Sequence, residues 1–246
     1  QNGSLLYAGT SAGCYRSLDG GGSWEQESSS LDIRSLAVSP ENDQTVFAGT
    51  PTGVYKSGDA GLSWIQALAL SSVNVLKFAP GQPEKLFALG YQLGISLDGG
   101  ETWSTSSSWV GTYPHDLAID PGNPLCLYVL NTFGLYKTTD GGIRWDKLTN
   151  FLAWSIAVNP ADSSELYLGY LSADPYNLFC NTQLSPDGGR SWSFFALDRY
   201  RMLFDPTNPD VIYAAAWRKG IYKSTDGGLT WEFSSSGIGN LPAGPL

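Results

Sequence analysis

The sequence predicts an all-β repeat protein, because one eight-residue motif recurs six times along its length. Each copy starts with Ser or Thr, has an Asp two residues later and ends in Trp. The copies are Ser17–Trp24, Ser57–Trp64, Ser96–Trp103, Thr138–Trp145, Ser185–Trp192 and Ser224–Trp231. Their aspartates follow one another at intervals of 40, 39, 42, 47 and 39 residues. A near-constant period of this size indicates repeated structural units, not one irregular core.

The motif has the chemistry of a locked turn between two strands. Asp-x-Gly places a carboxylate where it can accept backbone amides of its own turn, while the glycine adopts positive φ. The Trp opens the next strand and buries a large ring. We therefore interpret as structural the residues Asp19, Asp59, Asp98, Asp140, Asp187, Asp226, Trp24, Trp64, Trp103, Trp145, Trp192 and Trp231. Catalytic aspartates or calcium ligands are the alternative.

Three further strands fit into each period. Two short alternating segments precede the motif, as in Val46–Ala48 and Val54–Lys56, and such alternation is typical of β-strands. Before them comes an apolar run closed by a proline, which ends the strand because it has no amide hydrogen to donate. These runs are Leu36–Pro40, Leu76–Pro80, Leu117–Pro121, Ile156–Pro160 and Met202–Pro206. The period therefore contains four antiparallel strands, the size of a propeller blade.

We predict a six-bladed β-propeller that forms a single domain over residues 1–246. The chain opens at Leu5–Ala8, already in the second strand of a blade, so the first blade lacks its own inner strand. Aligned on the repeat, Leu241–Leu246 falls where that strand would begin, and we expect it to pair with the first blade and close the ring. In the alternative, the tail is disordered and the sequence is cut from a longer propeller.

The motif resembles the Asp-box, or bacterial neuraminidase repeat, of sialidases, sortilin-type receptors, xyloglucan hydrolases and photosystem II assembly factors. The resemblance covers essentially the whole chain and implies the propeller fold. It does not imply one activity, since that superfamily mixes enzymes, receptors and assembly factors. It also suggests an extracytoplasmic location, either secreted or periplasmic.

Composition limits the partners. A net charge of −9 with only 14 basic residues argues against nucleic acid and anionic membranes, because phosphate binding needs clustered Lys and Arg. We expect a monomer with no membrane insertion, no cofactor and no metal ion. The cysteines lack metal-ligand spacing. Cys14 is expected to be a buried free thiol, whereas Cys126 and Cys180 are either free or bridged between neighbouring blades.

The residues that the repeat does not explain map to one end of the predicted blades. This end holds the loops that lead into the innermost strand or join the second and third strands, and it lies opposite the boxes. Aligned positions that differ between blades are expected to ring the mouth of the central channel. The candidate ligand-binding residues are Arg34, Trp109, Tyr113, His115, Asp116, Trp154, Tyr170, Asp174, Tyr176, Tyr200, Arg201, Trp217 and Arg218.

We interpret the chain as a non-catalytic binding or interaction scaffold for a glycan or a protein. It would use the aromatic-rich mouth, where rings can stack on sugars or receive an apolar peptide, and an insertion in the fifth blade, Leu171–Asn181. The aromatic side chains could instead plug the channel. A glycoside hydrolase, sialidase-like or xyloglucanase-like, is the alternative function, but the sequence specifies no pair among the acids Asp116, Asp174 and Asp198.

Overall fold

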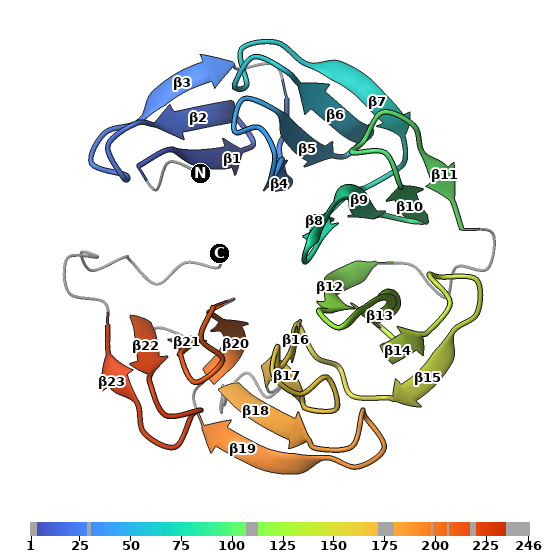
Figure 1. Cartoon of the computed structure of the whole chain (residues 1–246), viewed down its shortest axis with the longest axis vertical. Helices are drawn as coiled ribbons and strands as arrows, with labels where there is room; N and C mark the ends of the chain where they lie inside the picture. Colours follow the sequence, from blue (N-terminus) through green and yellow to red (C-terminus); the bar gives the residue numbers. More distant parts are fainter. Residues whose placement is uncertain are drawn as a thin grey trace.

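The computed structural model describes residues 4–28, 31–106, 113–171, 180–197, 199–205, 207–216 and 220–234, with the backbone alone at 170–171, 180, 196–197 and 199–200. Within these residues all regular structure is β, in strands β1 to β23. The strands form six antiparallel sheets arranged around a central axis (Figure 1). The chain is a six-bladed β-propeller, which confirms the fold class predicted from the repeat.

The strand bounds follow the predicted period. Blade 1 contains β1 (Leu6–Thr10), β2 (Gly13–Ser17) and β3 (Glu25–Ser28). Blade 2 contains β4 (Ser35–Val38), β5 (Val46–Thr50), β6 (Gly53–Ser57) and β7 (Ile65–Ala69). Blade 3 contains β8 (Val75–Ala79), β9 (Gln82–Leu89), β10 (Leu93–Ser96) and β11 (Ser104–Thr105). Blade 4 contains β12 (Pro114–Asp120), β13 (Asn123–Asn131), β14 (Gly134–Thr138) and β15 (Asp146–Thr149). Blade 5 contains β16 (Ser155–Val158), β17 (Leu166–Leu171), β18 (Cys180–Ser185) and β19 (Ser193–Leu197). Blade 6 contains β20 (Arg199–Phe204), β21 (Ile212–Ala216), β22 (Gly220–Ser224) and β23 (Glu232–Phe233).

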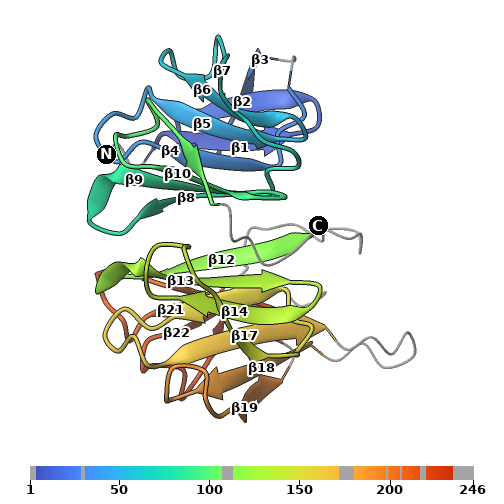
Figure 2. The same ribbon diagram turned by 90° about the vertical axis from the view of Figure 1, so that its right-hand side faces the viewer.

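In blades 2 to 6 the strands pair in chain order from the axis outward. The innermost strands are β4, β8, β12, β16 and β20. Figure 2 shows the ring from the side, with inner strands such as β8 and β12 running broadly along the ring axis. Blade 1 has three described strands, in the order β1-β2-β3. The segment predicted to supply its inner strand, Leu241–Leu246, lies outside the described residues, so ring closure by that segment stays a prediction.

The hydrophobic core consists of clusters between consecutive blades. The cluster between blades 2 and 3, for example, joins Phe47 to Leu86, both fully buried. Burial of such side chains is worth about 1.5–3 kcal/mol each. Five blade interfaces are filled in this way, and each includes the box Trp of the later blade: Trp64, Trp103, Trp145, Trp192 and Trp231. These five tryptophans therefore join neighbouring blades.

The seam between blade 6 and blade 1 differs from the other five. On blade 1, Trp24 is 43% exposed and Leu6 is 39% exposed. On blade 6, Leu203 is 68% exposed and Phe233 is 61% exposed. Within the part of the chain that the structure describes, no hydrophobic cluster joins these two blades. Trp24 is thus the one exposed box Trp, whereas the five others are half-buried.

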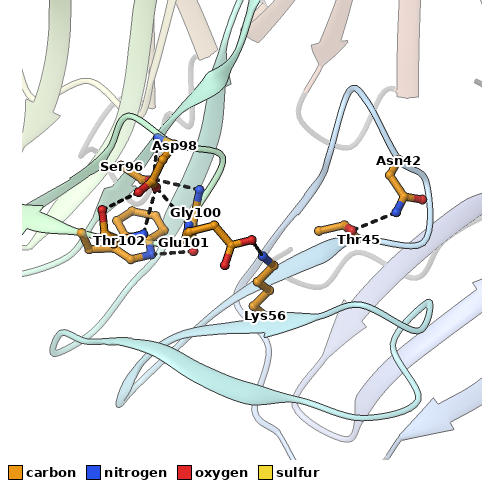
Figure 3. Close-up of polar contacts among 9 residues, drawn as sticks. Asn42, Thr45, Lys56, Ser96, Asp98, Gly100, Glu101 and Thr102 are labelled. Carbon is orange, nitrogen blue, oxygen red and sulfur yellow. Dashed lines mark hydrogen bonds and ion pairs between the residues drawn. The ribbon is translucent and has the colours of Figure 1, made fainter.

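The box turn is held by its own aspartate, as the third copy illustrates (Figure 3). Asp98 Oδ1 accepts hydrogen bonds from Ser96 Oγ at 2.8 Å and from the amides of Glu101 at 3.0 Å and Thr102 at 2.9 Å. The Thr102 hydroxyl donates to Asp98 Oδ2, and these bonds, with that hydroxyl as the largest cause, lower the pKa of Asp98 to about 2. The carboxylate is thus occupied by its own turn.

The same clamp recurs in every blade. The box aspartate accepts the Ser or Thr hydroxyl two residues earlier at 2.7–2.8 Å in all six copies. In the fourth copy Arg144 replaces the Ser or Thr before the Trp, so Asp140 accepts only the amide there, at 3.0 Å. This geometry supports a structural role for the six aspartates. Among the described residues no group of three or more His, Cys, Asp or Glu could hold a metal ion.

Two cysteines are buried free thiols, Cys14 and Cys126. This confirms the prediction for Cys14, and burial raises the pKa of its thiol to about 11. Because Cys126 is free, the alternative of a bridge between Cys126 and Cys180 is wrong. Burial also raises the pKa of the Cys126 thiol, which keeps it protonated and unreactive at neutral pH.

Candidate functional site

The candidate residues of the mouth lie where the chain enters the innermost strands. Arg34 directly precedes β4, and its Nη1 donates to Ser72 Oγ at 3.0 Å and Asn74 Oδ1 at 3.3 Å, both in the connection that leads into β8. Its Nε lies 3.8 Å from Asp32 Oδ2. Arg34 and Asn74 hold equivalent repeat positions in blades 2 and 3. The side chains at this position in blades 2 and 3 therefore contact each other.

Two aromatic pairs continue this ring through blades 3 to 5. The rings of Tyr91, on the β9–β10 turn, and Tyr113, directly before β12, meet edge to face with centroids 5.9 Å apart. The rings of His115, in β12, and Trp154, directly before β16, are stacked at 4.3 Å with 10° between their planes. Only Pro114 separates the two pairs along the chain. We call these four side chains the aromatic platform.

The platform is exposed, but a hydrogen bond holds its imidazole in place. His115 Nδ1 lies 3.1 Å from the carbonyl oxygen of Ala153, which fixes the imidazole against the Trp154 ring. Trp154 nevertheless remains 50% exposed and Tyr113 remains 60% exposed. Tyr113 also has a φ of 58°. A bulky residue in this left-handed region is an outlier that persists only where its surroundings hold it, and such strain often marks a binding site.

The next residue in each blade occupies a second set of equivalent positions: Ser35, Val75, Asp116, Ser155 and Arg201. In blades 2 and 4 the side chain at this position makes a hydrogen bond to the following blade. Ser35 Oγ accepts the amide of Leu76 in blade 3 at 2.9 Å. Asp116 Oδ2 likewise accepts the amide of Ile156 in blade 5 at 3.2 Å. These side chains join the inner strand of one blade to that of the next.

Asp116 is not a free acid. It is only 2% exposed, its Oδ1 accepts the Leu117 amide at 2.9 Å, and Lys77 Nζ lies 3.1 Å from that oxygen. Sequence reasoning assigned Asp116 to ligand binding but missed Lys77. The available signal was a break in the repeat, since Ala37, Ala118 and Ala157 occupy the position of Lys77 in other blades.

A cavity of about 560 Å³ lies among the innermost strands of blades 3 to 6. Its lining includes Lys77 from β8, Asp116 from β12, Ser155 from β16 and Arg201 from β20. Two of these four, Asp116 and Arg201, were candidate residues. The structure therefore brings Asp116, Ser155 and Arg201 of three consecutive blades to one space.

Other candidates cannot be placed in this geometry. Trp109, Asp174, Tyr176, Trp217 and Arg218 lie outside the described residues, as does Asp198. Tyr170 lies in β17 and Tyr200 in β20, each described by its backbone alone. Phe151, which shares a loop with Trp154, contacts the box residue Trp192 edge-on at 6.4 Å, so it serves a blade interface.

The fold and the six clamped turns define the class: the chain is a β-propeller built from Asp-box repeats. The family described as BNR/Asp-box repeat matches residues 95–105, from the end of β10 through the third box to the end of β11. No curated protein sequence matches the chain.

Several solved structures resemble the whole chain. An ancestral GH74 enzyme superposes with a TM-score of 0.74 at 20% identity over 94% of this chain and 37% of its own. YCF48 bound to D1 peptide gives a TM-score of 0.68 at 17% identity over 93% of this chain and 78% of its own. The extracellular domain of a one-component system from B. thetaiotaomicron gives 0.68 at 13% identity over 96% of this chain and 33% of its own. At these identities the likeness shows the fold alone, and the chain spans about a third of the length of the first and third of these proteins.

Proposed function

We propose that this chain is a non-catalytic binding scaffold whose aromatic platform receives a glycan. One observation carries the proposal: the flat Trp154 ring is stacked on His115 at 4.3 Å and is still half exposed. An aromatic face that is fixed before binding loses little entropy when a sugar ring stacks on it. Tyr91 and Tyr113 extend the apolar surface toward blade 3.

The other candidates complete the proposed site by their place in the repeat. These are Arg34, Trp109, Tyr170, Asp174, Tyr176, Tyr200, Arg201, Trp217 and Arg218. We further propose that the blade-five insertion contacts the partner, because long insertions on a rigid scaffold often carry recognition. A monomer in an extracytoplasmic compartment fits this role, and the net charge of −9 disfavours nucleic acid.

A peptide or protein partner is the second candidate. It is favoured by exposed apolar side chains in the loops. Leu152, in the loop that holds Trp154, is 61% exposed, and Phe133, in the β13–β14 turn, is 54% exposed. The similar propeller of YCF48 was solved with D1 peptide. Exposed apolar and aromatic side chains are enriched at protein interfaces.

A glycoside hydrolase remains the alternative from another class. Such an enzyme needs two carboxyl groups about 5–5.5 Å or about 6.5–9.5 Å apart. Asp116 is a poor member of such a pair, because its oxygens already accept the Leu117 and Ile156 amides and pair with Lys77. Turnover of chromogenic glycosides or sialosides that disappears in Tyr200→Phe would favour the enzyme.

A glycan array with purified protein tests the glycan proposal. Binding should fall roughly tenfold or more in Trp154→Ala, since loss of one stacked ring is worth about 1–2 kcal/mol. Phe194→Ala is the matched control, because this ring is also exposed, at 58%, but lies in the outermost strand β19. Equal losses in both variants, or no signal on any glycan, would contradict the proposal.

A further inference from the structure

The central cavity has a chemistry distinct from that of the aromatic platform. Its walls are largely apolar, with Phe78, Ile119, Val158, Met202 and Phe204 among the lining residues. Its volume of about 560 Å³ falls in the range of small-molecule sites, about 300–1,000 Å³. None of the four platform residues lines it.

The charges of the side chains that line the cavity do not sum to zero. Lys77 and Asp116 form an ion pair at 3.1 Å, and Asp116 is further satisfied by two amides. Arg201 is a second cation. The residue is exposed, and within the part of the chain that the structure describes its guanidinium has no hydrogen-bond or ion-pair partner. The cavity therefore carries one net positive charge in a chain whose net charge is −9.

A second polar group points to a ligand. Ser155 is only 3% exposed and lines the same cavity. Its hydroxyl makes no hydrogen bond to any described residue, unlike the hydroxyl of Ser35 at the equivalent position, which accepts the Leu76 amide. A hydroxyl group that lines a cavity and has no partner there can donate a hydrogen bond to a ligand.

We propose that this cavity binds a carboxylate carried on an apolar body, with Arg201 and Ser155 as the donors. The guanidinium offers two parallel N–H groups that match a carboxylate. A phosphate group would bring about 1.5–2 negative charges into apolar walls that hold only one uncompensated cation. A neutral ligand would desolvate Arg201 without replacing its hydration. The proposal does not depend on glycan binding.

Two sources share this chemistry, a fatty acid and the free C-terminus of an apolar peptide. Isothermal titration calorimetry at pH 7 with the 246-residue chain can separate them. The probes are sodium octanoate, 1-octanol, and an acetylated tripeptide of two valines and a C-terminal leucine with a free or amidated terminus. We expect one of the two carboxylates to bind, and its neutral analogue to bind at least roughly tenfold more weakly.

Variants locate the site. Arg201→Gln should weaken the binding roughly tenfold or more, Arg201→Lys should retain part of it, and the exposed box residue Arg190→Gln should have no effect. Ala157→Leu adds volume at a lining position and should weaken binding without removing charge. Urea unfolding of each variant separates loss of the site from loss of the fold.

The proposal is wrong if neither carboxylate binds, or if 1-octanol and the amidated peptide bind as well as the acids. It is also wrong if folded Arg201→Gln binds like the wild type. Trp154→Ala serves as an independent reference, because this residue does not line the cavity. Carboxylate binding that survives Trp154→Ala but not Arg201→Gln would show that the cavity binds the carboxylate without the aromatic platform.

Discussion

Replacing Gly100 with alanine should destabilise the propeller more than replacing its neighbour Gly99. Both glycines belong to the third box and both have positive φ, 87° and 70°. An alanine in the left-handed region costs about 1–2 kcal/mol at either position. Part of this cost is offset by about 0.4–1 kcal/mol, because alanine restricts the unfolded chain. The pair is therefore matched in backbone strain.

The surroundings of the two glycines differ. A Cβ at Gly99 would meet nothing within 4 Å, whereas a Cβ at Gly100 would lie 2.4 Å from the ring of Phe47. Phe47 is fully buried in the interface between blades 2 and 3, so it has little room to move. Overpacking of this kind costs about 1–3 kcal/mol. We expect a loss of about 1 kcal/mol for Gly99→Ala and about 2–4 kcal/mol for Gly100→Ala.

Urea denaturation followed by tryptophan fluorescence measures both free energies of unfolding. The slope of the unfolding free energy against urea concentration should be the same in both variants, so that the unfolding midpoints report stability directly. For a chain of this size, 1 kcal/mol corresponds to about 2–4 °C in Tm. Equal losses in the two variants would refute the reasoning, because they would show that the box glycine does not contact the preceding blade.

The remaining predictions concern charge and closure. The box turns hold the pKa of Asp59, Asp98, Asp187 and Asp226 at about 2, below the ordinary value of 3.8. A carboxyl group with a lowered folded pKa stabilises the fold above its unfolded pKa, so urea midpoints should hold from pH 7 to about 5 and fall between about pH 4 and 2; constant midpoints at pH 2.5 would contradict this. Lys56 and Glu101 join blades 2 and 3 at 2.5 Å, but Glu101 is 70% exposed, so a double-mutant cycle with Gln at both positions should give a coupling of only about 0.2–1 kcal/mol. If Leu241–Leu246 closes the ring, deletion of residues 235–246 should lower the Tm, whereas an unchanged Tm would exclude that role.

The platform shows how far the sequence could locate the site. The repeat placed Arg34, His115 and Trp154 at one row of positions, because the period is regular enough to align the blades. It could not predict that His115 and Trp154 stack, since stacking depends on the distance and rotation between two blades. Lys77 was missed because it follows Leu76 in a run that is otherwise part of the hydrophobic core. Only the fold brings its amine to Asp116 of the next blade.

The sequence by itself determined the strand order, the box turns and the six-bladed ring, since these follow from local hydrogen bonding and a fixed period. Tertiary structure decided which groups remain unused once the blades pack. Asp116 and Arg201 occupy equivalent positions, yet the first is neutralised by a lysine from the preceding blade and the second has no partner among the described residues. Whether a charge is compensated depends on neighbours from other blades, some forty residues away along the chain, and no local pattern reports it.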